Sequence, residues 1–461
     1  MNYKPYKHQQ ETINFYAKTP AAMDASDAGC GKTFCIIKDI EHRLNTNINS
    51  KSLIIAPKSI LHSAWQDDFK KFAPHITTSV ATAPNKTRIQ AFQKPAQVYI
   101  TNTDAVKWLL TRVEKNPNFF KDYETIVIDE SIFFANSSMR TKALLKLRPY
   151  FKYARCLNGT LIGGPITNVY YQYYFLTGAQ HVGSSFNKFR NMTMIAQSKP
   201  NTPQFHTWVN KPNIELAVAK LLEPITIRHV LTDVVDMPSR LEYKYSYKPN
   251  NKVMKAYNEM KSIARTELED AKKNKKQISA VNASATVIKL LQISSGALRD
   301  TQGNPIMVDT QRFDLVVDLL LQYQNQKPLV FFNFTAQREY LMDHATKAGL
   351  HVTYIDGSVS SAERKKRVRD FEAGVYEALF MQPKATSRGL TLISSTCTIW
   401  SAPIYQGDTY LQAQARNYRI GQKNRVLTIQ VQAKGTLEAD VYRKLSKKVS
   451  SIELLNDALA S

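Results

Sequence analysis

Two stretches of this chain repeat the same rhythm, a short apolar run followed by a segment with helical periodicity. The first stretch contains the runs SLIIAP at 52–57, QVYITN at 97–102 and TIVIDES at 125–131, and the second includes PLVFFNF at 328–334 and CTIWSAP at 397–403. Strands that lack polar alternation are buried on both faces, and a helix after each strand is the connection that a parallel sheet requires. The rhythm therefore predicts an α/β fold with two parallel-sheet lobes.

A helical, strongly charged segment separates the two lobes. We expect the first lobe at residues 1–238, a helical insertion and hinge at 239–307, and the second lobe at 308–461. The lysine run KKNKK at 272–276 is interpreted as a solvated helix end rather than a nucleic-acid contact. The aromatic run YYQYYFL at 170–176 resembles a surface for stacking bases, but an aromatic helix after a loop is more often core, and core is our prediction.

The charge balance indicates a polyanionic partner. Lys and Arg number 62 against 38 Asp and Glu, so the formal net charge of the 461 residues is +24. This balance favours a nucleic-acid partner over the alternative of a basic but unspecialised surface. The four cysteines form no CxxC pair, the N-terminus lacks an apolar signal core, and no apolar run is long enough to span a bilayer. We expect a soluble intracellular protein with neither a zinc ribbon nor a disulfide framework.

The segment SDAGCGKT at 26–33 has the shape of a phosphate-binding loop. Gly29 and Gly31 let backbone N–H groups approach phosphate oxygens. Lys32 can reach the β and γ phosphates, and Thr33 can hold Mg²⁺. The strict pattern begins with glycine where this chain has Ser26, and GKT alone occurs by chance, so the interpretation needs a second motif.

Asp129 and Glu130, at the end of the apolar run 125–131, supply that second motif. Adjacent acids at a strand end are unfavourable unless a cation meets them, and here one carboxylate can position Mg²⁺ while the other polarises an attacking water. A pair of solvated loop acids is the weaker alternative. This lobe is therefore predicted to bind and hydrolyse a nucleoside triphosphate. Gln9, just before a helical segment, offers the donor and acceptor that read adenine.

Arg416 and Arg419 lie three residues apart in QAQARNYRIGQ at 412–422, a spacing that places both on one face of a helix. Phosphoryl transfer spreads negative charge over the γ phosphate, which an arginine can stabilise. Because these arginines belong to the second lobe, they would reach a nucleotide on the first lobe across a cleft. A basic surface helix is the alternative, and it does not explain why arginines, glutamines and the terminating Gly421 occur together.

In this order the segments resemble the Swi/Snf-type ATPases of helicase superfamily two, close to compact members akin to annealing helicases and to phage or bacterial homologues. The resemblance runs from about Tyr3 to Lys448. The matching segments are YKPYKHQ (Q motif), DAGCGKT (motif I), IIAPKSILHSAW (Ia), ITNTD (Ib), VIDES (II), LNGTLIGGPITN (III), VFFNFT (IV), ATSRGLTL (V) and QARNYRIGQ (VI). The RIGQ of motif VI is the most specific of them, because it separates this family from DEAD-box RNA helicases.

The resemblance implies two RecA-like lobes, with ATP and Mg²⁺ as cofactors and duplex or branched DNA as the partner. It assigns the nucleotide and magnesium to Gln9, Gly29, Gly31, Lys32, Thr33, Asp129, Glu130 and Gly389. Asp129 would be the magnesium ligand with Thr33, Glu130 the base, and Arg416 and Arg419 the arginine fingers. Contacts to the DNA backbone are expected from Lys58, Thr101, Asn102, Thr335 and Ser387. Such contacts position the protein and carry little sequence information.

The chain departs from the family pattern at three places. Ile132 stands where the DEAH-like box ends in His, so a polar link from the ATP site to motif III is either missing or made differently. Motif III carries extra residues at 161–164, after the small hydroxyl loop of Gly159 and Thr160 that could relay the state of the phosphates. Ala415 replaces a usual acid in motif VI. None of these changes removes a group that does the chemistry, so an active ATPase is expected.

The predicted function is an ATP-driven motor that tracks along duplex DNA. With no histone-tail reader or zinc module in these residues, action on branched DNA is favoured over chromatin remodelling: branch migration, fork reversal, annealing or unwinding. A conventional strand-separating DNA helicase, an RNA helicase and a binding protein without activity remain alternatives. We expect a monomer located in the cytoplasm, or in the host cytoplasm if the protein is viral, and no membrane contact. The sequence identifies no protein partner.

Overall fold

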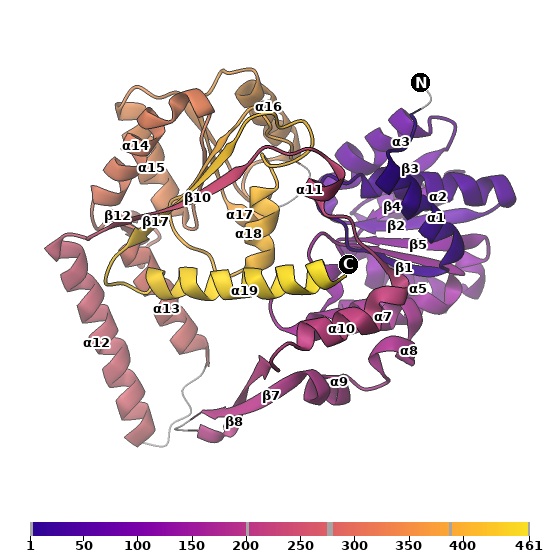
Figure 1. Ribbon diagram of the computed structural model, residues 1–461, viewed down its shortest axis with the longest axis horizontal. Helices are drawn as coiled ribbons and strands as arrows, with labels where there is room; N and C mark the ends of the chain where they lie inside the picture. The colour runs from indigo at the N-terminus through magenta and orange to yellow at the C-terminus, as the bar shows by residue number, and fades with distance from the viewer. Residues whose placement is uncertain (1–2, 200–201, 274–279, 387–389, 460–461) are drawn as a thin grey trace. The chain divides into compact units, whose positions relative to one another are not determined.

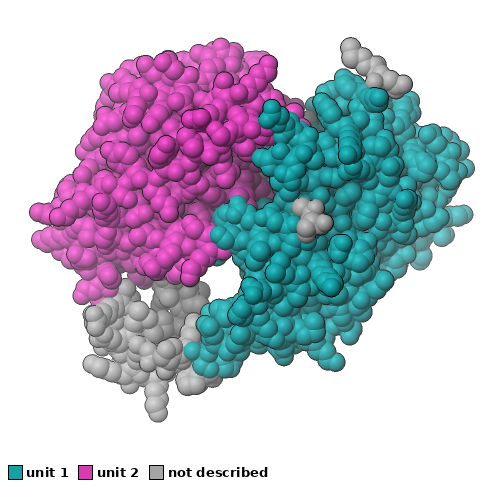
Figure 2. All heavy atoms as spheres, viewed as in Figure 1, with its two compact units in different colours: residues 1–236, 448–461 teal, residues 237–447 magenta. Residues whose placement is uncertain are grey.

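The computed structural model describes residues 3–199, 202–273, 280–386 and 390–459. They form two compact units, one of residues 1–236 with 448–461 and the other of residues 237–447, which Figure 2 shows in different colours. Each unit contains its own parallel sheet with helices. The predicted fold class, α/β with two parallel-sheet lobes, is confirmed.

The sheet of the first unit has seven strands in the order β3-β4-β2-β5-β6-β1-β9, and every pair of neighbours is parallel (Figure 1). The bounds are β1 Ala21–Asp24, β2 Lys51–Ala56, β3 Thr78–Ala81, β4 Val98–Asn102, β5 Tyr123–Asp129, β6 Tyr153–Leu157 and β9 Thr226–Ile227. The apolar runs of the first lobe therefore form strands where they were predicted. The order separates β1 from β5 by β6 alone, which brings together chain segments far apart in the sequence.

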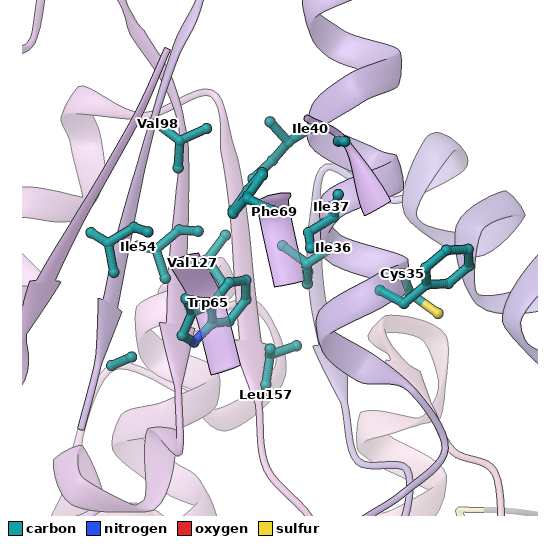
Figure 3. Close-up of a cluster of buried hydrophobic side chains, with 14 of the residues drawn as sticks. Cys35, Ile36, Ile37, Ile40, Ile54, Trp65, Phe69, Val98, Val127 and Leu157 are labelled. Atoms are coloured by element: carbon teal, nitrogen blue, oxygen red, sulfur yellow. The ribbon is translucent and has the colours of Figure 1, made fainter. Parts of the chain in front are cut away.

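Helices cover both faces of this sheet. In Figure 3, Ile36 and Ile40 of α2 and Phe69 of α3 pack on Ile54 of β2 and Val127 of β5. Because successive strand residues point to opposite faces, the burial of their neighbours along β2 and β5 shows that the other face is covered too. The helices are α1 Lys7–Lys18, α2 Lys32–Thr46, α3 Asp67–Phe72, α4 Asn85–Gln93, α5 Val106–Lys115, α6 Met139–Leu147, α7 Val169–Thr177, α8 Ala179–Val182, α9 Phe186–Thr193, α10 Ile214–Leu222 and α11 Leu231–Val234.

The aromatic run at 170–176 lies in α7, where Tyr170, Tyr173 and Phe175 are buried, so the prediction that it belongs to the core is confirmed. After α9 the chain forms an antiparallel hairpin of β7 (Met194–Lys199) and β8 (Thr202–Asn210).

A buried ion triad fastens α2 to the sheet. Arg155 of β6 donates from Nε to Asp39 Oδ2 at 3.0 Å, and Arg43, one turn further along α2, donates from Nη2 to Asp39 Oδ1 at 2.9 Å. Arg155 Nη2 also donates to the carbonyl oxygen of Tyr16 in α1 at 2.8 Å. The side chains of Arg155 and Asp39 are 0% and 2% exposed. Burial lowers the pKa of Arg155, and the Asp39 carboxylate opposes that shift.

The second unit contains a six-stranded parallel sheet in the order β10-β17-β16-β13-β15-β14. Its strands are β10 Arg240–Tyr247, β13 Leu329–Phe331, β14 Val352–Ile355, β15 Ala378–Met381, β16 Cys397–Trp400 and β17 Val426–Ala433, and a small antiparallel pair is formed by β11 Ala297–Arg299 and β12 Pro305–Met307. The helices are α12 Asn251–Lys273, α13 Ala280–Ser294, α14 Gln311–Gln322, α15 Thr335–Lys347, α16 Ser361–Glu372, α17 Pro383–Thr386, α18 Gly407–Gln414 and α19 Glu438–Ala458. Arg312 of α14 and Glu438 of α19 form a buried pair at 2.7 Å.

The structure differs from the predicted helical insertion at 239–307. Its first part is β10, which pairs with β17 along its whole length at the edge of the second sheet. An edge strand can keep polar side chains in solvent, so RLEYKYSY lacks the apolar signature of the buried strands. The middle of the insertion is helical as expected, with Val253 and Tyr257 of α12 packed on Leu290 and Ile293 of α13, and its end forms the β11–β12 pair. The lysine run at 272–276 lies largely outside the described residues.

The compact units also differ from the predicted limits at the C-terminus. Residues 448–461, which include the last turns of α19, belong to the first unit rather than to a second lobe that continues to residue 461. There Ser451 Oγ donates to Glu215 Oε1 of α10 at 2.5 Å, and Ile452 and Leu455 are fully buried. The sequence shows one continuous amphipathic helix and does not show which unit its last turns contact.

We expect Asp39→Asn to destabilise the first unit by about 3 kcal/mol or more, because it leaves two buried guanidinium groups without a counter-charge. Urea unfolding followed by tryptophan fluorescence measures the change. The matched control is Glu41→Gln on the same helix, whose pair with Lys38 is partly exposed and should contribute under about 1 kcal/mol. Equal effects of the two substitutions would contradict a fastening role for Asp39.

Candidate functional site

The predicted phosphate-binding loop joins the end of β1 to the start of α2. Gly31 is the N-cap of α2 with a left-handed φ of 85°, and Gly29 has a φ of 104°. Lys32 Nζ donates to the carbonyl oxygens of Ser26 at 2.5 Å and Asp27 at 3.0 Å, so the lysine lies inside the loop. The first-turn N–H groups of α2 and the positive end of its dipole are directed at the same loop, which is the geometry that binds an anion.

Gln9 lies directly against this loop. Its Oε1 accepts a hydrogen bond from the backbone N–H of Tyr6 at 3.0 Å, and its Nε2 donates to the carbonyl oxygen of Cys30 at 3.4 Å. A Cβ on Gly31 would stand 2.2 Å from Gln9 Nε2. Gly31 is therefore required twice, for its left-handed φ and for the close approach of Gln9. The structure thus brings Gln9 against the phosphate-binding loop, although Gln9 and Cys30 are 21 positions apart in the chain.

The two acids lie at the same edge of the sheet as the loop. Residue pairing across the strands places Asp24 of β1 beside Leu157 of β6, and Leu157 beside Asp129 of β5, in one row. Asp129 Oδ2 accepts a hydrogen bond from the buried indole Nε1 of Trp65 at 2.9 Å, which orients the carboxylate. Glu130 adopts a left-handed conformation with φ 56° and ψ 57°, an uncommon state for a residue with a side chain.

The loop of motif III also reaches the phosphate-binding loop. A Cβ on Gly159 would lie 3.7 Å from the backbone nitrogen of Ala28 and 4.0 Å from Lys32 Nζ. The extra residues at 161–164 begin with two fully buried side chains, so the insertion is anchored in the core. The polar link left open by Ile132 is made differently: Ser131, the residue before it, donates from Oγ to Gln172 Oε1 of α7 at 2.5 Å.

The segment after β9 contacts the loop from another side. Arg228 donates from Nη1 to the carbonyl oxygen of Ala25 at 2.6 Å and from Nη2 to Asp27 Oδ1 at 3.0 Å. His229 donates its backbone N–H to Ser26 Oγ at 3.1 Å, and burial lowers the pKa of its imidazole. Burial also raises the pKa of the neighbouring Cys30 thiol to about 11, so the thiol is protonated at neutral pH.

Sequence reasoning assigned no role to Trp65, Ser131, Gln172 or Arg228. Trp65 and Arg228 are both buried in the structure, where an indole N–H or a guanidinium needs a hydrogen-bond partner. Nothing in the sequence identified those partners. Residues 228 and 27 are 201 positions apart, and only the fold brings them together.

In the second unit, Arg416 and Arg419 converge on one carbonyl group. Arg416 Nη1 donates to the carbonyl oxygen of Leu390 at 3.0 Å, and Arg419 Nη1 donates to the same oxygen at 3.2 Å. The predicted helix is wrong at this point, because α18 ends at Gln414 and both arginines lie in the turns beyond it. The two side chains point the same way because they bond to the same carbonyl oxygen, not because they lie on one face of a helix. Gly421 has a φ of 99°, but it does not terminate a helix, because α18 has already ended.

The residues predicted to contact DNA fall into different environments. Lys58 is exposed just after β2, and Thr335 is exposed at the start of α15, where its hydroxyl accepts from Arg299. Thr101 is fully buried and donates to the carbonyl oxygen of Ala81 at 2.6 Å, so its side chain cannot meet DNA in this conformation. Asn102 is also buried, and its Oδ1 accepts from Arg88 at 3.2 Å. Both side chains are thus bonded to neighbouring segments of the first unit, and their contact with DNA stays a prediction. Ser387 and Gly389 lie outside the described residues.

Within the described residues, no group of three or more His, Cys, Asp and Glu side chains could hold a metal ion. Mg²⁺ bound with a nucleotide needs only one or two protein oxygens, because phosphates and waters supply the others. Thr33, in the first turn of α2, and Asp129, at the end of β5, provide such oxygens at one edge of the sheet. No helix in the described part of the chain is long and apolar enough to cross a membrane.

Comparison with known families gives two matches that together cover most of the chain. Residues 8–296 match the model of the SNF2-related domain, and residues 311–421 match the helicase conserved C-terminal domain. The first match alone includes every residue of the candidate site that lies in the first unit.

Individual relatives are distant. An uncharacterized ATP-dependent helicase of Mycoplasma pneumoniae is 24% identical over 431 residues, which cover 92% of this chain and 39% of the relative. The putative ATP-dependent helicase/translocase YwqA of Bacillus subtilis is 22% identical, with coverage of 94% and 46%. This chain therefore spans less than half the length of either relative. Among solved structures, the SWI2/SNF2 ATPase core of Sulfolobus solfataricus in complex with dsDNA is 19% identical with a TM-score of 0.43, covering 100% of this chain and 96% of that one.

We expect Gly31→Ala to lower the melting temperature and to displace Gln9, because the added Cβ meets Gln9 Nε2 and the left-handed φ becomes strained by about 1 kcal/mol. Thermal unfolding monitored by circular dichroism measures the effect. Gly159→Ala is the control in the same site, since its Cβ would meet only ordinary contacts. A melting temperature unchanged by Gly31→Ala would show that the Gln9 contact does not form.

Proposed function

Because this chain belongs to the SNF2-related family, we propose that it is an ATP-driven motor that moves along duplex DNA and remodels branched DNA. The observation that carries the proposal is the meeting of an anion-binding loop and an acid pair at one edge of the first sheet, in a chain that also matches a helicase C-terminal domain. Relatives named as ATP-dependent helicases support the same activity.

The side chains around the loop have complementary roles in hydrolysis. Lys32 and the first-turn N–H groups of α2 bind the phosphates, and Gln9 binds the adenine edge. Thr33 and Asp129 would hold Mg²⁺, which neutralises charge on the phosphate oxygens. Glu130 orients and polarises the attacking water. The hydrogen bond from Trp65 keeps one oxygen of Asp129 fixed, so the carboxylate does not have to reorient when the metal binds.

Arg416 and Arg419 complete the catalytic group from the second unit. Their guanidinium groups share the carbonyl oxygen of Leu390, which keeps them oriented together. Closure of the two units on ATP brings this pair to the γ phosphate, and hydrolysis releases it. Hydrolysis then depends on closure, and closure shifts the grip of each unit on DNA.

The DNA contacts are made largely through the phosphate backbone. Lys58 and Thr335 are exposed at the carboxyl edges of the two sheets, so each unit has at least one group available for such a contact. The net charge of +24 supplies the long-range attraction. Binding should therefore weaken steeply as salt increases.

Branched DNA is the favoured substrate because of the energy that each step requires. Strand separation costs about 1.4 kcal/mol for every base-pair step that is lost. Branch migration breaks one pair as it forms another, so a motor that only grips duplex backbone can drive it. A dedicated wedge between the strands is then unnecessary.

Steady-state ATP hydrolysis at one fixed salt concentration tests the proposal, with no nucleic acid, linear duplex, single strand, four-way junction and RNA compared. Strong stimulation by duplex, greatest with the junction, is expected. Stimulation by single strands or RNA alone would support a strand-separating or RNA helicase instead. Lys32→Ala should abolish turnover, and normal turnover in the purified variant would contradict the assignment of the phosphate-binding loop. No hydrolysis on any substrate would indicate a binding protein without activity.

Arg419→Ala should bind ATP with nearly unchanged affinity but hydrolyse it about a thousandfold more slowly, because an arginine finger acts on charge that develops in the transition state. A fluorescent ATP analogue measures binding, and phosphate release measures turnover. Arg425→Ala is the control, since Arg425 is an exposed arginine of the same unit that donates to Ser239. Normal turnover in Arg419→Ala would exclude the proposed role.

A further inference from the structure

A buried glutamine of α7, Gln172, contacts two segments. One is the segment that directly follows the acid pair, and the other is the motif III loop, which lies against the phosphate-binding loop. Gln172 Oε1 accepts hydrogen bonds from Ser131 Oγ at 2.5 Å and from Asn158 Nδ2 at 3.4 Å. Gln172 Nε2 donates to the carbonyl oxygens of Leu161 and Asn168, both at 2.8 Å. Gln172, Ser131 and Asn158 are each 1% exposed. Water therefore does not compete for these bonds, and breaking one leaves a buried polar group unsatisfied.

The two ends of the Gln172 amide face different segments. The acceptor end meets Ser131 in motif II, and the donor end meets the backbone of the motif III loop. An amide is planar and rigid, so a shift of either segment must either move the side chain or break a bond at one end. Few other side chains could do this, because the link needs an acceptor and two donors on one short group.

At its motif II end, the link holds the residue directly after the proposed base. Glu130 has a left-handed backbone, which a residue with a side chain adopts at a cost, and such a conformation persists only where neighbouring contacts fix it. Ser131 is the next residue and begins the short helix of residues 131–134. Its buried hydrogen bond to Gln172 is such a contact.

At its motif III end, the link holds a loop that lies on the phosphate-binding loop. Asn158 donates its backbone N–H to the carbonyl oxygen of Asp24 at 3.0 Å, and Gly159 lies close to Ala28 and Lys32. Within the described residues, Asn158 Oδ1 and Thr160 Oγ1 are buried without a hydrogen-bond partner. Both atoms lie in the loop that rests on the phosphate-binding loop, so hydrogen-bonding groups of this loop are directed to the same region as Lys32.

We propose that Gln172 is a positioning residue that transmits the state of the phosphate-binding loop, through the motif III loop, to Ser131 and the backbone of Glu130. The proposal rests on the proposed function and adds a residue that sets the position of the proposed base, Glu130, relative to the phosphate-binding loop. It also accounts for Ile132, since the preceding Ser131 makes the polar link and leaves position 132 free to be apolar. Gln172 is buried, so it acts through its hydrogen-bond partners.

The experiment compares Gln172→Met, Gln172→Glu and Ser131→Ala with wild type. Methionine fills the same space and removes both ends of the link. Glutamate keeps the acceptor for Ser131 and loses both donated bonds, whereas Ser131→Ala removes only the motif II end. Tyr173→Phe is the matched control: Tyr173 is the next residue of α7, fully buried, and loses one buried hydrogen bond to Thr226 Oγ1.

Two quantities are measured: ATP hydrolysis with and without saturating duplex DNA, and hydrogen exchange of the peptide 158–168 with and without a non-hydrolysable ATP analogue. For Gln172→Met we expect DNA stimulation of kcat to fall by about tenfold with the KM for ATP nearly unchanged. The analogue should still protect the phosphate-binding loop but no longer alter exchange in 158–168. Tyr173→Phe should keep the wild-type stimulation, and Ser131→Ala combined with Gln172→Met should be no worse than Gln172→Met alone.

Wild-type stimulation in Gln172→Met, or an equal loss in Tyr173→Phe, would overturn the proposal. If Gln172→Met does not fold, Gln172→Glu and Ser131→Ala decide, because each removes one end of the link, and wild-type stimulation in both would overturn it as well. A wild-type protein that binds no ATP analogue and hydrolyses no ATP would instead refute the proposed function. The two failures are therefore distinguishable.

Discussion

The buried triad of Arg155, Asp39 and Arg43 is the interaction on which the candidate site depends. Three charged groups in a dry interior are unfavourable unless they satisfy one another, so their geometry allows little freedom. Arg155 is part of β6 and Asp39 is part of α2, so satisfying them fixes the helix against the strand. The helix begins at the phosphate-binding loop, and its position on the sheet sets the place of Lys32 and of the first-turn N–H groups.

The parallel sheet brings the residues of the candidate site to one edge. Parallel strands all end on one side, and the order β5-β6-β1 brings the acid pair and the phosphate-binding loop to either side of β6. The loop after β6 lies between them and carries Gly159 against Lys32. Candidate site residues from three distant parts of the sequence therefore meet because of strand order. Gln172 joins the motif III loop and the segment after the acid pair to α7, and Arg228 joins the phosphate-binding loop to the segment after β9.

In the second unit, backbone acceptors hold the turns that carry Arg416 and Arg419. Arg416 and Arg419 are directed to one carbonyl oxygen, and Gln422 donates to the carbonyl oxygens of Ile393, Ser395 and Asn417, so the motif is braced by backbone acceptors. This bracing explains why glutamine accompanies the arginines: it holds the turn in which they lie.

The sequence by itself determined the fold class and the strands that are buried on both faces, because apolar runs leave a local signature. It also located the glycine-rich loop and the acid pair, which the sheet brings to one edge. It did not determine the edge strand β10, whose polar residues lack that signature, or the end of α18, where the helical spacing of Arg416 and Arg419 continues into turns. The burial of Thr101 and Asn102 was also invisible, since a polar residue at a strand end reads the same whether it faces solvent or a neighbouring segment. Only the tertiary structure decided that Ser131 bonds to Gln172 and Arg228 to Asp27, because these pairs depend on strand order and helix placement that residues far apart in the chain set together.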